Sequence, residues 1–198
     1  KNIVLATSKN KENIPLVDVV KAYNIEIYSG SENNVLSRFV EIANIHKVKY
    51  IVRITGDSPF VDANIINKGL LQIEKNNLDY VSTTLDNSYP VGIHVEIFKS
   101  KLIENLDPES STEISKEHVT PFIYNNKSLK CSLIKYKISY PPGRYTVDYD
   151  KDIEFFRKIE DKSGLRLSEM SPKNIQDLYE SNNSIFLINN MLQKERTV

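Results

Sequence analysis

The sequence predicts one α/β domain, built on a mostly parallel β-sheet with helices on both of its faces. Over about the first 85 residues, short apolar segments alternate with amphipathic ones, which is typical of consecutive strand-helix units. The chain has 198 residues, of which 40% are hydrophobic. That length suffices for one sizeable core and is too short to favour two independent domains. We therefore expect a single domain over residues 1–198.

Each element expected in the first half has a local signal. Apolar, β-branched segments predict strands, and apolar residues spaced i, i+3, i+4 predict helices. Ser29 followed by Glu32 matches a capping box, which indicates the start of a helix. The expected strands are 2–7, 25–30, 50–55 and 79–84, and the expected helices are 14–24, 64–77 and one whose apolar stripe is Val35, Leu36, Phe39, Val40 and Ala43.

The second half is less regular, and we expect residues 87–140 to form a lobe against the main sheet. Two helices are expected near the C-terminus. The first carries Ile153, Phe156 and Ile159 and ends near Gly164, and the second has Ser171 as its N-cap and Pro172 as its first residue. The other expected elements are strands at 93–98, 131–138 and 144–150, and a helix at 112–126.

Composition excludes several classes of protein. Because 26 basic residues balance 26 acidic ones, no bulk charge draws the chain to nucleic acid or to an anionic membrane. The single cysteine, Cys131, excludes an internal disulfide framework and a cysteine-rich zinc site, and suits the cytoplasm. No apolar segment has the roughly 18 residues that span a membrane, and no signal peptide opens the chain. The first residue is Lys1 rather than Met, so we expect the true N-terminus to be missing.

Two aspartates are candidate metal ligands. Ligands of open α/β sheets bind beyond the carboxyl ends of the strands. Asp57 follows a strand that is expected to end near Thr55, and Asp148 stands in the same relation to RYTV. Two carboxylates at neighbouring strand ends suit Mg²⁺, which binds one or two carboxylates together with substrate phosphates. Asp-Ser-Pro is also an ordinary turn, and Asp148 stands just before a helix, where a capping acid is common. On these local patterns alone, the turn and the cap are the better supported interpretations.

Six segments are similar, in order and spacing, to the cytidylyltransferase family: IVLATS, IYSGSENNVLSRFVEIA, VRITGDSPFVD, YPVGIHVEIF, EHVTPFIYNN and RYTVDYDKDIEFF. The chain resembles acylneuraminate and 3-deoxy-manno-octulosonate cytidylyltransferases, and most of all the spore coat polysaccharide biosynthesis protein F branch. The resemblance implies a Rossmann-like nucleotide-diphosphosugar transferase (GT-A) fold. It also implies transfer of CMP from CTP to an acidic sugar, with Mg²⁺ as cofactor, for surface polysaccharide biosynthesis. A homodimer formed through the 87–140 lobe is implied as well.

The resemblance assigns roles to two acids and a histidine. Asp57 corresponds to the family's metal- and nucleotide-binding aspartate, and Asp148 to its second metal position, so both are expected to be catalytic. His118 resembles the histidine that faces the sugar acid. A capped surface histidine is the alternative interpretation of His118.

Four further residues lie in matching segments. Arg38, Arg53 and Arg144 could bind phosphate or the sugar carboxylate in bidentate geometry. Each of them alone is more often a surface or packing arginine. Glu96 lies where the family usually has a glutamate, which either supports the substrate pocket or pairs with a basic neighbour.

Three features depart from the family pattern. The family's N-terminal loop, which contains glycine, serine, arginine and lysine and binds the triphosphate, has no counterpart before Lys1, so the chain is expected to be N-terminally truncated and poorly active. His94 stands where the branch often has aspartate, and Ser8 stands where sialate and octulosonate enzymes often do. Two alternatives stay open. One is a GT-A glycosyltransferase, which commonly shows Asp-x-Asp where this chain has a single acid, and the other is a non-catalytic remnant of the fold.

Overall fold

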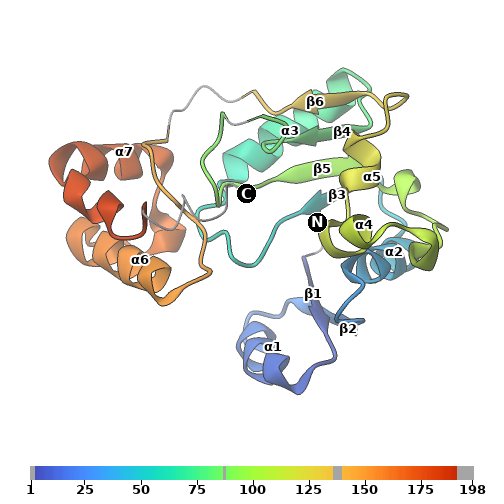
Figure 1. Ribbon diagram of the computed structural model, residues 1–198, viewed down its shortest axis with the longest axis horizontal. Helices are drawn as coiled ribbons and strands as arrows, with labels where there is room; N and C mark the ends of the chain where they lie inside the picture. The colour runs from blue at the N-terminus through green and yellow to red at the C-terminus, as the bar shows by residue number, and fades with distance from the viewer. Residues whose placement is uncertain (1–2, 87, 136–139, 191–198) are drawn as a thin grey trace. The chain divides into compact units, whose positions relative to one another are not determined.

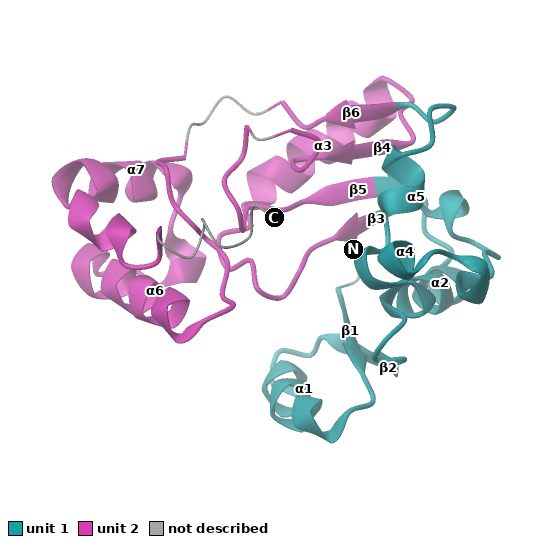
Figure 2. Ribbon diagram, in the orientation of Figure 1, with its two compact units in different colours: residues 1–51, 98–130 teal, residues 52–97, 131–198 magenta. Residues whose placement is uncertain are grey.

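The computed structural model describes residues 3–86, 88–135 and 140–190. The chain divides into two compact units, one formed by residues 1–51 and 98–130, the other by residues 52–97 and 131–198 (Figure 2). The chain passes from one unit to the other within β3 (Tyr50–Arg53) and β5 (Glu96–Lys99). No helix in the described ranges has both the length and the apolar character needed to cross a membrane.

The first half of the chain alternates strands and helices, as the sequence predicts (Figure 1). Up to β4 the elements are β1 (Val4–Ser8), the 3-10 helix η1 (Lys11–Asn13), α1 (Ile14–Lys21), β2 (Glu26–Gly30), α2 (Val35–His46), β3, α3 (Ala63–Lys75) and β4 (Tyr80–Ser82). β1 and β2 form a parallel two-stranded sheet, in which Ser8 lies opposite Gly30. The second sheet has the strand order β3-β5-β4-β6, and β4 and β6 (Cys131–Leu133) pair in parallel.

The second half contains more helix than strand. After β5 it comprises η2 (Ser100–Leu102), η3 (Pro108–Ser110), α4 (Glu113–His118), α5 (Pro121–Tyr124), β6, α6 (Asp150–Ser163), η4 (Leu167–Glu169), α7 (Pro172–Ser181) and η5 (Asn183–Leu187). α6 ends at Gly164, which has a φ of 68°, and Ser171 caps α7, as predicted. The expected lobe and the strand expected at 131–138 include residues 87 and 136–139, which lie outside the described residues.

Three predictions about local structure were wrong. Ser29 does not cap a helix, because it lies in β2; the N-cap of α2 is Asn34, whose side chain accepts a hydrogen bond from the Ser37 N–H at 3.0 Å. The helix expected at 112–126 is two helices, α4 and α5. Val119, between them, has a φ of 70°, and the proline that opens α5 has no backbone N–H to continue α4.

The strand expected at 144–150 is also absent from the described part of that range. The backbone there bonds to two separate segments rather than to one strand. The Tyr145 N–H donates to the carbonyl of Val91 at 2.8 Å, and the Val147 N–H donates to the carbonyl of Asp57 at 2.9 Å. Residues 144–148 therefore join two loops of the second unit.

An aromatic cluster anchors this segment in the core of the second unit. The Tyr145 ring is fully buried, and its centroid lies 5.8 Å from that of Phe60, 6.1 Å from that of Phe155 and 6.5 Å from that of Phe186. Its hydroxyl donates to the carbonyl of Pro141 at 2.7 Å. Since edge-to-face aromatic pairs stabilise a core beyond their buried area, this packing holds residues 144–148 without a strand ladder.

Candidate active site

The two predicted metal acids lie on segments that are hydrogen-bonded to each other. The Val147 N–H donates to the backbone carbonyl of Asp57 at 2.9 Å. The hydroxyl of Thr146 donates to Oδ2 of the same aspartate at 3.0 Å. Because Asp148 is the next residue after Val147, both acids lie in one part of the second unit. The side chain of Asp148 is 22% exposed, so it reaches solvent.

Hydroxyl groups surround the carboxylate of Asp57. The turn is closed by the Ser58 N–H, which donates to the carbonyl of Thr55 at 3.3 Å, and the Ser58 hydroxyl donates to Oδ1 of Asp57 at 3.2 Å. Burial opposes ionisation of Asp57, but hydrogen bonds from Thr55, Thr146 and Ser58 outweigh it and hold the pKa of this carboxyl below its ordinary value. Asp57 is thus a turn residue, as its local pattern indicates, and also a carboxylate that stays ionised at neutral pH.

Asp148 is held by a buried arginine. The Arg144 side chain is 1% exposed, and its guanidinium pairs with Asp148 and with Asp152. The cap of α6 is provided by Asp152, whose Oδ2 accepts a hydrogen bond from the Tyr149 N–H at 3.0 Å. The Arg144 side chain is therefore buried and paired with two carboxylates of the protein itself, as expected for a packing arginine.

A second buried pair involves the predicted residues Arg53 and Glu96. Their side chains form an ion pair, in which Arg53 is 14% exposed and Glu96 is 6% exposed. The Tyr80 hydroxyl donates a hydrogen bond to Glu96 at 2.6 Å. Burial and the neighbouring Glu96 raise the pKa of Tyr80. Glu96 thus pairs with a basic neighbour, one of the two roles that the sequence leaves open. Burial lowers the pKa of the nearby His94, although Asp57 and Glu96 oppose this effect, so His94 is neutral at pH 7.

Arg38 and His118 lie in the first unit. One Nη of Arg38 donates to the carbonyl of Ala6 at 2.9 Å, and its buried Nε has no hydrogen-bond partner among the described residues. The aliphatic part of the Arg38 side chain packs on Gly30, at the end of β2. A Cβ added to Gly30 would lie 2.7 Å from Cγ of Arg38. His118 is the last residue of α4 and is exposed, as the surface alternative predicts.

The chemistry of the donor set fits Mg²⁺. No three His, Cys, Asp or Glu side chains in the described ranges form a group that could hold a metal ion. Mg²⁺ does not need such a group, because it retains waters and is commonly bound by one or two carboxylates plus substrate phosphates. Asp57 and Asp148 provide two carboxylates on adjoining segments, and no additional protein ligand is required.

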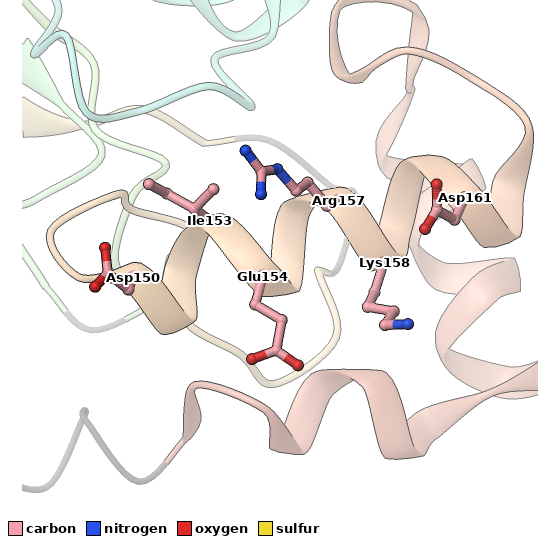
Figure 3. Close-up of a pocket in the computed structure, with 6 residues that line it drawn as sticks. All are labelled: Asp150, Ile153, Glu154, Arg157, Lys158 and Asp161. Atoms are coloured by element: carbon pink, nitrogen blue, oxygen red, sulfur yellow. The ribbon is translucent and has the colours of Figure 1, made fainter.

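A hollow of about 460 Å³ lies elsewhere, along α6 (Figure 3). Its lining residues all belong to this one helix, and none of them is a predicted site residue: Asp150, Ile153, Glu154, Arg157, Lys158 and Asp161. The hollow offers charges of both signs and no cluster of converging polar groups. It therefore does not identify the active site.

Sequence reasoning missed three residues around the candidate site. Thr146 binds Asp57, and Asp152 and Asn189 are both fully buried beside Arg144. The position of Asp152, three residues after the N-cap of α6, is a signal that could have identified it as a capping acid. Asn189 lies 45 residues from Arg144 and has no local signal.

Comparison with known proteins decides the family. The cytidylyltransferase family model matches residues 1–194. The chain belongs to the cytidylyltransferase family. This cytidylyltransferase is 30% identical over 203 residues to an uncharacterized protein of Methanocaldococcus jannaschii, over 98% of this chain and 79% of the relative. It is also 30% identical over 179 residues to the spore coat polysaccharide biosynthesis protein SpsF of Bacillus subtilis, over 83% of this chain and 69% of SpsF.

A solved structure confirms the fold of this cytidylyltransferase. It is similar to a cytidylyltransferase from Leptospira borgpetersenii with a TM-score of 0.82 and 22% sequence identity, over 92% of this chain and 77% of that one. The Rossmann-like α/β fold predicted from the sequence is therefore confirmed. Together with the family match, this makes the protein a nucleotidyltransferase that transfers CMP.

Proposed function

We propose that this cytidylyltransferase transfers CMP from CTP to an acidic sugar, with Mg²⁺ bound by Asp57 and Asp148. The observation that carries the proposal is the pair of hydrogen bonds, from Val147 and Thr146, that ties the segment ending in Asp148 to Asp57. A role in surface polysaccharide biosynthesis is supported by the similarity to the SpsF protein, whose name states that role.

The reaction requires little covalent chemistry from the protein. The oxygen of a sugar hydroxyl attacks the α-phosphorus of CTP and its proton passes to water. A new P–O bond forms, and pyrophosphate leaves with the electrons of the broken P–O bond. Mg²⁺ held by Asp57 and Asp148 would supply positive charge for the phosphate oxygens as their negative charge develops. The protein positions the reactants, and Asp57 contributes a carboxylate that stays ionised because of its hydroxyl neighbours.

Two of the three predicted arginines already bind carboxylates of the protein. Arg53 pairs with Glu96, and Arg144 pairs with Asp148 and Asp152, so these two arginines are poorly placed to bind the sugar carboxylate. Recognition of the acceptor by Arg38 and His118, which the sequence predicts, stays a prediction. An arginine fork is well suited to a planar carboxylate.

The proposal is tested with protein expressed from its complete gene. Pyrophosphate release is measured with CTP, UTP, GTP and ATP, each with N-acetylneuraminate, 3-deoxy-manno-octulosonate and a neutral hexose. We expect release with CTP and an acidic sugar. Release with UTP or GTP and none with CTP would overturn the nucleotide assignment, and release with the neutral hexose alone would overturn the acceptor assignment.

The metal role is tested with Asp57→Asn and Asp148→Asn. We expect each substitution to lower turnover by orders of magnitude, and the double variant to be little worse than either single one, because residues that act as a unit are non-additive. If Asp57 only closes its turn and Asp148 only pairs with Arg144, the substitutions would instead lower stability and leave turnover per folded molecule unchanged. Folding and activity are therefore measured on the same samples.

A homodimer is part of the proposal. Residues 98–130, within the predicted lobe, expose two apolar side chains, since Ile114 is 62% and Tyr124 is 40% exposed. An isologous pair is the commonest oligomer geometry. Light scattering is expected to give a dimer mass for the wild type and a monomer mass for Ile114→Lys. A wild-type monomer at micromolar concentration would contradict it.

A further inference from the structure

A fully buried carboxylate lies beside the proposed metal acid. The side chain of Asp152 is 0% exposed. Its Oδ1 accepts hydrogen bonds from Arg144 Nε at 3.1 Å and from Asn189 Nδ2 at 2.8 Å. Its Oδ2 accepts from the backbone N–H groups of Asp148 at 2.9 Å and Tyr149 at 3.0 Å. A carboxylate has about four lone-pair sites, so Asp152 is saturated by protein donors and is not itself a metal ligand.

Arg144 connects this buried acid to Asp148. Its Nε binds Asp152, and one Nη binds Oδ2 of Asp148. The guanidinium is a planar, rigid fork, so an arginine fixed on Asp152 also fixes the rotation of the Asp148 side chain. Asp148 is anchored at its backbone as well, since its own N–H donates to Asp152.

The third member comes from the far end of the chain. Asn189 is 0% exposed, and its Nδ2 donates to the backbone carbonyl of Arg144 at 3.0 Å as well as to Asp152. Its buried Oδ1 has no hydrogen-bond partner in the described part of the chain. A buried oxygen without a hydrogen bond lowers stability. The amide nitrogen of Asn189, in contrast, binds both Arg144 and Asp152.

We propose that Arg144, Asp152 and Asn189 form a positioning network that presents the carboxylate of Asp148 to the metal-nucleotide complex. This inference rests on the proposed function, because it concerns the same metal site. The three residues are positioning residues, which act through Asp148. Groups that orient metal ligands typically change metal affinity or activity by about 10- to 100-fold when they are substituted.

The test uses Asn189→Leu, with Asn190→Leu as its matched control. Leucine is close to asparagine in size, and it removes both amide donors together with the unsatisfied oxygen. Asn190 is the exposed neighbour of Asn189 on the same segment. Mn²⁺ is titrated into each protein, with and without CTP, and the free Mn²⁺ is measured by electron paramagnetic resonance. We expect Asn189→Leu to weaken Mn²⁺ binding at least about 10-fold and Asn190→Leu to leave it unchanged.

Arg144→Lys is titrated alongside, because it retains the charge but cannot bridge two carboxylates with a fork. We expect Arg144→Lys to weaken Mn²⁺ binding in the same way. If Asn189→Leu does not fold, Arg144→Lys tests the network in its place. Urea unfolding of each variant measures stability separately. If the folded variants bind Mn²⁺ as the wild type does and lose only stability, the network is purely architectural and the inference is wrong.

Two further titrations separate this inference from the proposed function. If Asp57→Asn and Asp148→Asn bind Mn²⁺ as the wild type does, the metal site itself is wrong. If both lose Mn²⁺ binding while Asn189→Leu and Arg144→Lys retain it, the metal site stands and only the positioning network is refuted.

Discussion

Gly92 lies against residues 145–146, in the segment that connects the two proposed metal ligands, and Gly92→Ala should disrupt that contact. Gly92 has a φ of 95°, a conformation that favours glycine. An added Cβ would overlap the backbone carbonyl of Tyr145 and lie 2.5 Å from the backbone N of Thr146. Backbone atoms cannot rotate away as a side chain tip can. The segment from Tyr145 to Thr146 must therefore shift.

The cost of Gly92→Ala has two parts. Alanine in the left-handed region costs about 1 to 2 kcal/mol. A shift of the segment weakens the hydrogen bond from the Tyr145 N–H to Val91 and the one from Thr146 to Asp57, which contribute about 1 kcal/mol and about 1.5 to 3 kcal/mol, the larger value because the acceptor is charged. We expect a total of about 4 kcal/mol or more, which is a large part of an ordinary stability of about 5 to 15 kcal/mol.

Gly164→Ala is the matched control. Gly164 also has a positive φ, of 68°, but no atom lies within 4 Å of the position of an added Cβ. It should cost only about 1 kcal/mol, because the left-handed penalty is partly offset by the lower entropy of the unfolded chain. Urea unfolding followed by circular dichroism gives both values. Equal losses for the two variants would refute the argument that the close approach of residues 145–146 requires Gly92.

Two further predictions concern the buried charges. The depressed pKa of Asp57 contributes stability above the unfolded-state value of about 3.9, and this contribution is lost as the pH falls through the folded-state pKa. Thr146→Val removes one donor and raises that pKa, so the variant should be less stable than wild type at pH 7, and this difference should shrink as the pH falls through the folded-state pKa of Asp57. In an Asp57→Asn background, the effect of Thr146→Val on stability should not change with pH. Glu96→Gln leaves Arg53 without its ion-pair partner and should cost about 3 to 5 kcal/mol. Tyr80→Phe removes the hydroxyl that donates to Glu96 and should cost about 1.5 to 3 kcal/mol; a larger loss for Tyr80→Phe in urea unfolding would contradict this ranking.

The elements that the sequence predicts well are those with local signals. In α2, the apolar spacing identifies Leu36, Val40 and Ala43 as buried, and in α7 the Ser171-Pro172 pair identifies the first turn. These signals depend only on side chains within a few residues of one another. One apolar position in α6 was misassigned, since Ile153 is 40% exposed.

The segment 144–148 shows what a local pattern does not contain. Its apolar and β-branched residues favour a strand, but its partners are Val91 and Asp57, which lie on different loops. The sequence likewise suggests a ligand-binding role for Arg144, because it does not show the residues that the side chain contacts in the fold. Its charge is visible in the sequence, whereas only the fold brings Asn189 to it and buries it.

The segment DYDKD contains Asp148, Asp150 and Asp152. These three aspartates have different roles because α6 begins in the middle of the segment. The helix begins at Asp150, and two residues along a helix correspond to a rotation of about 200°. Asp150 is therefore exposed in the first turn, while Asp152 faces the core and is saturated by Arg144, Asn189 and two backbone N–H groups. Asp148 precedes the helix and reaches solvent. Asp152 satisfies the helix terminus and binds the arginine, whereas Asp148 reaches solvent directly after the segment that is hydrogen-bonded to Asp57. Asp148 is therefore the one of the three acids that we propose as a metal ligand.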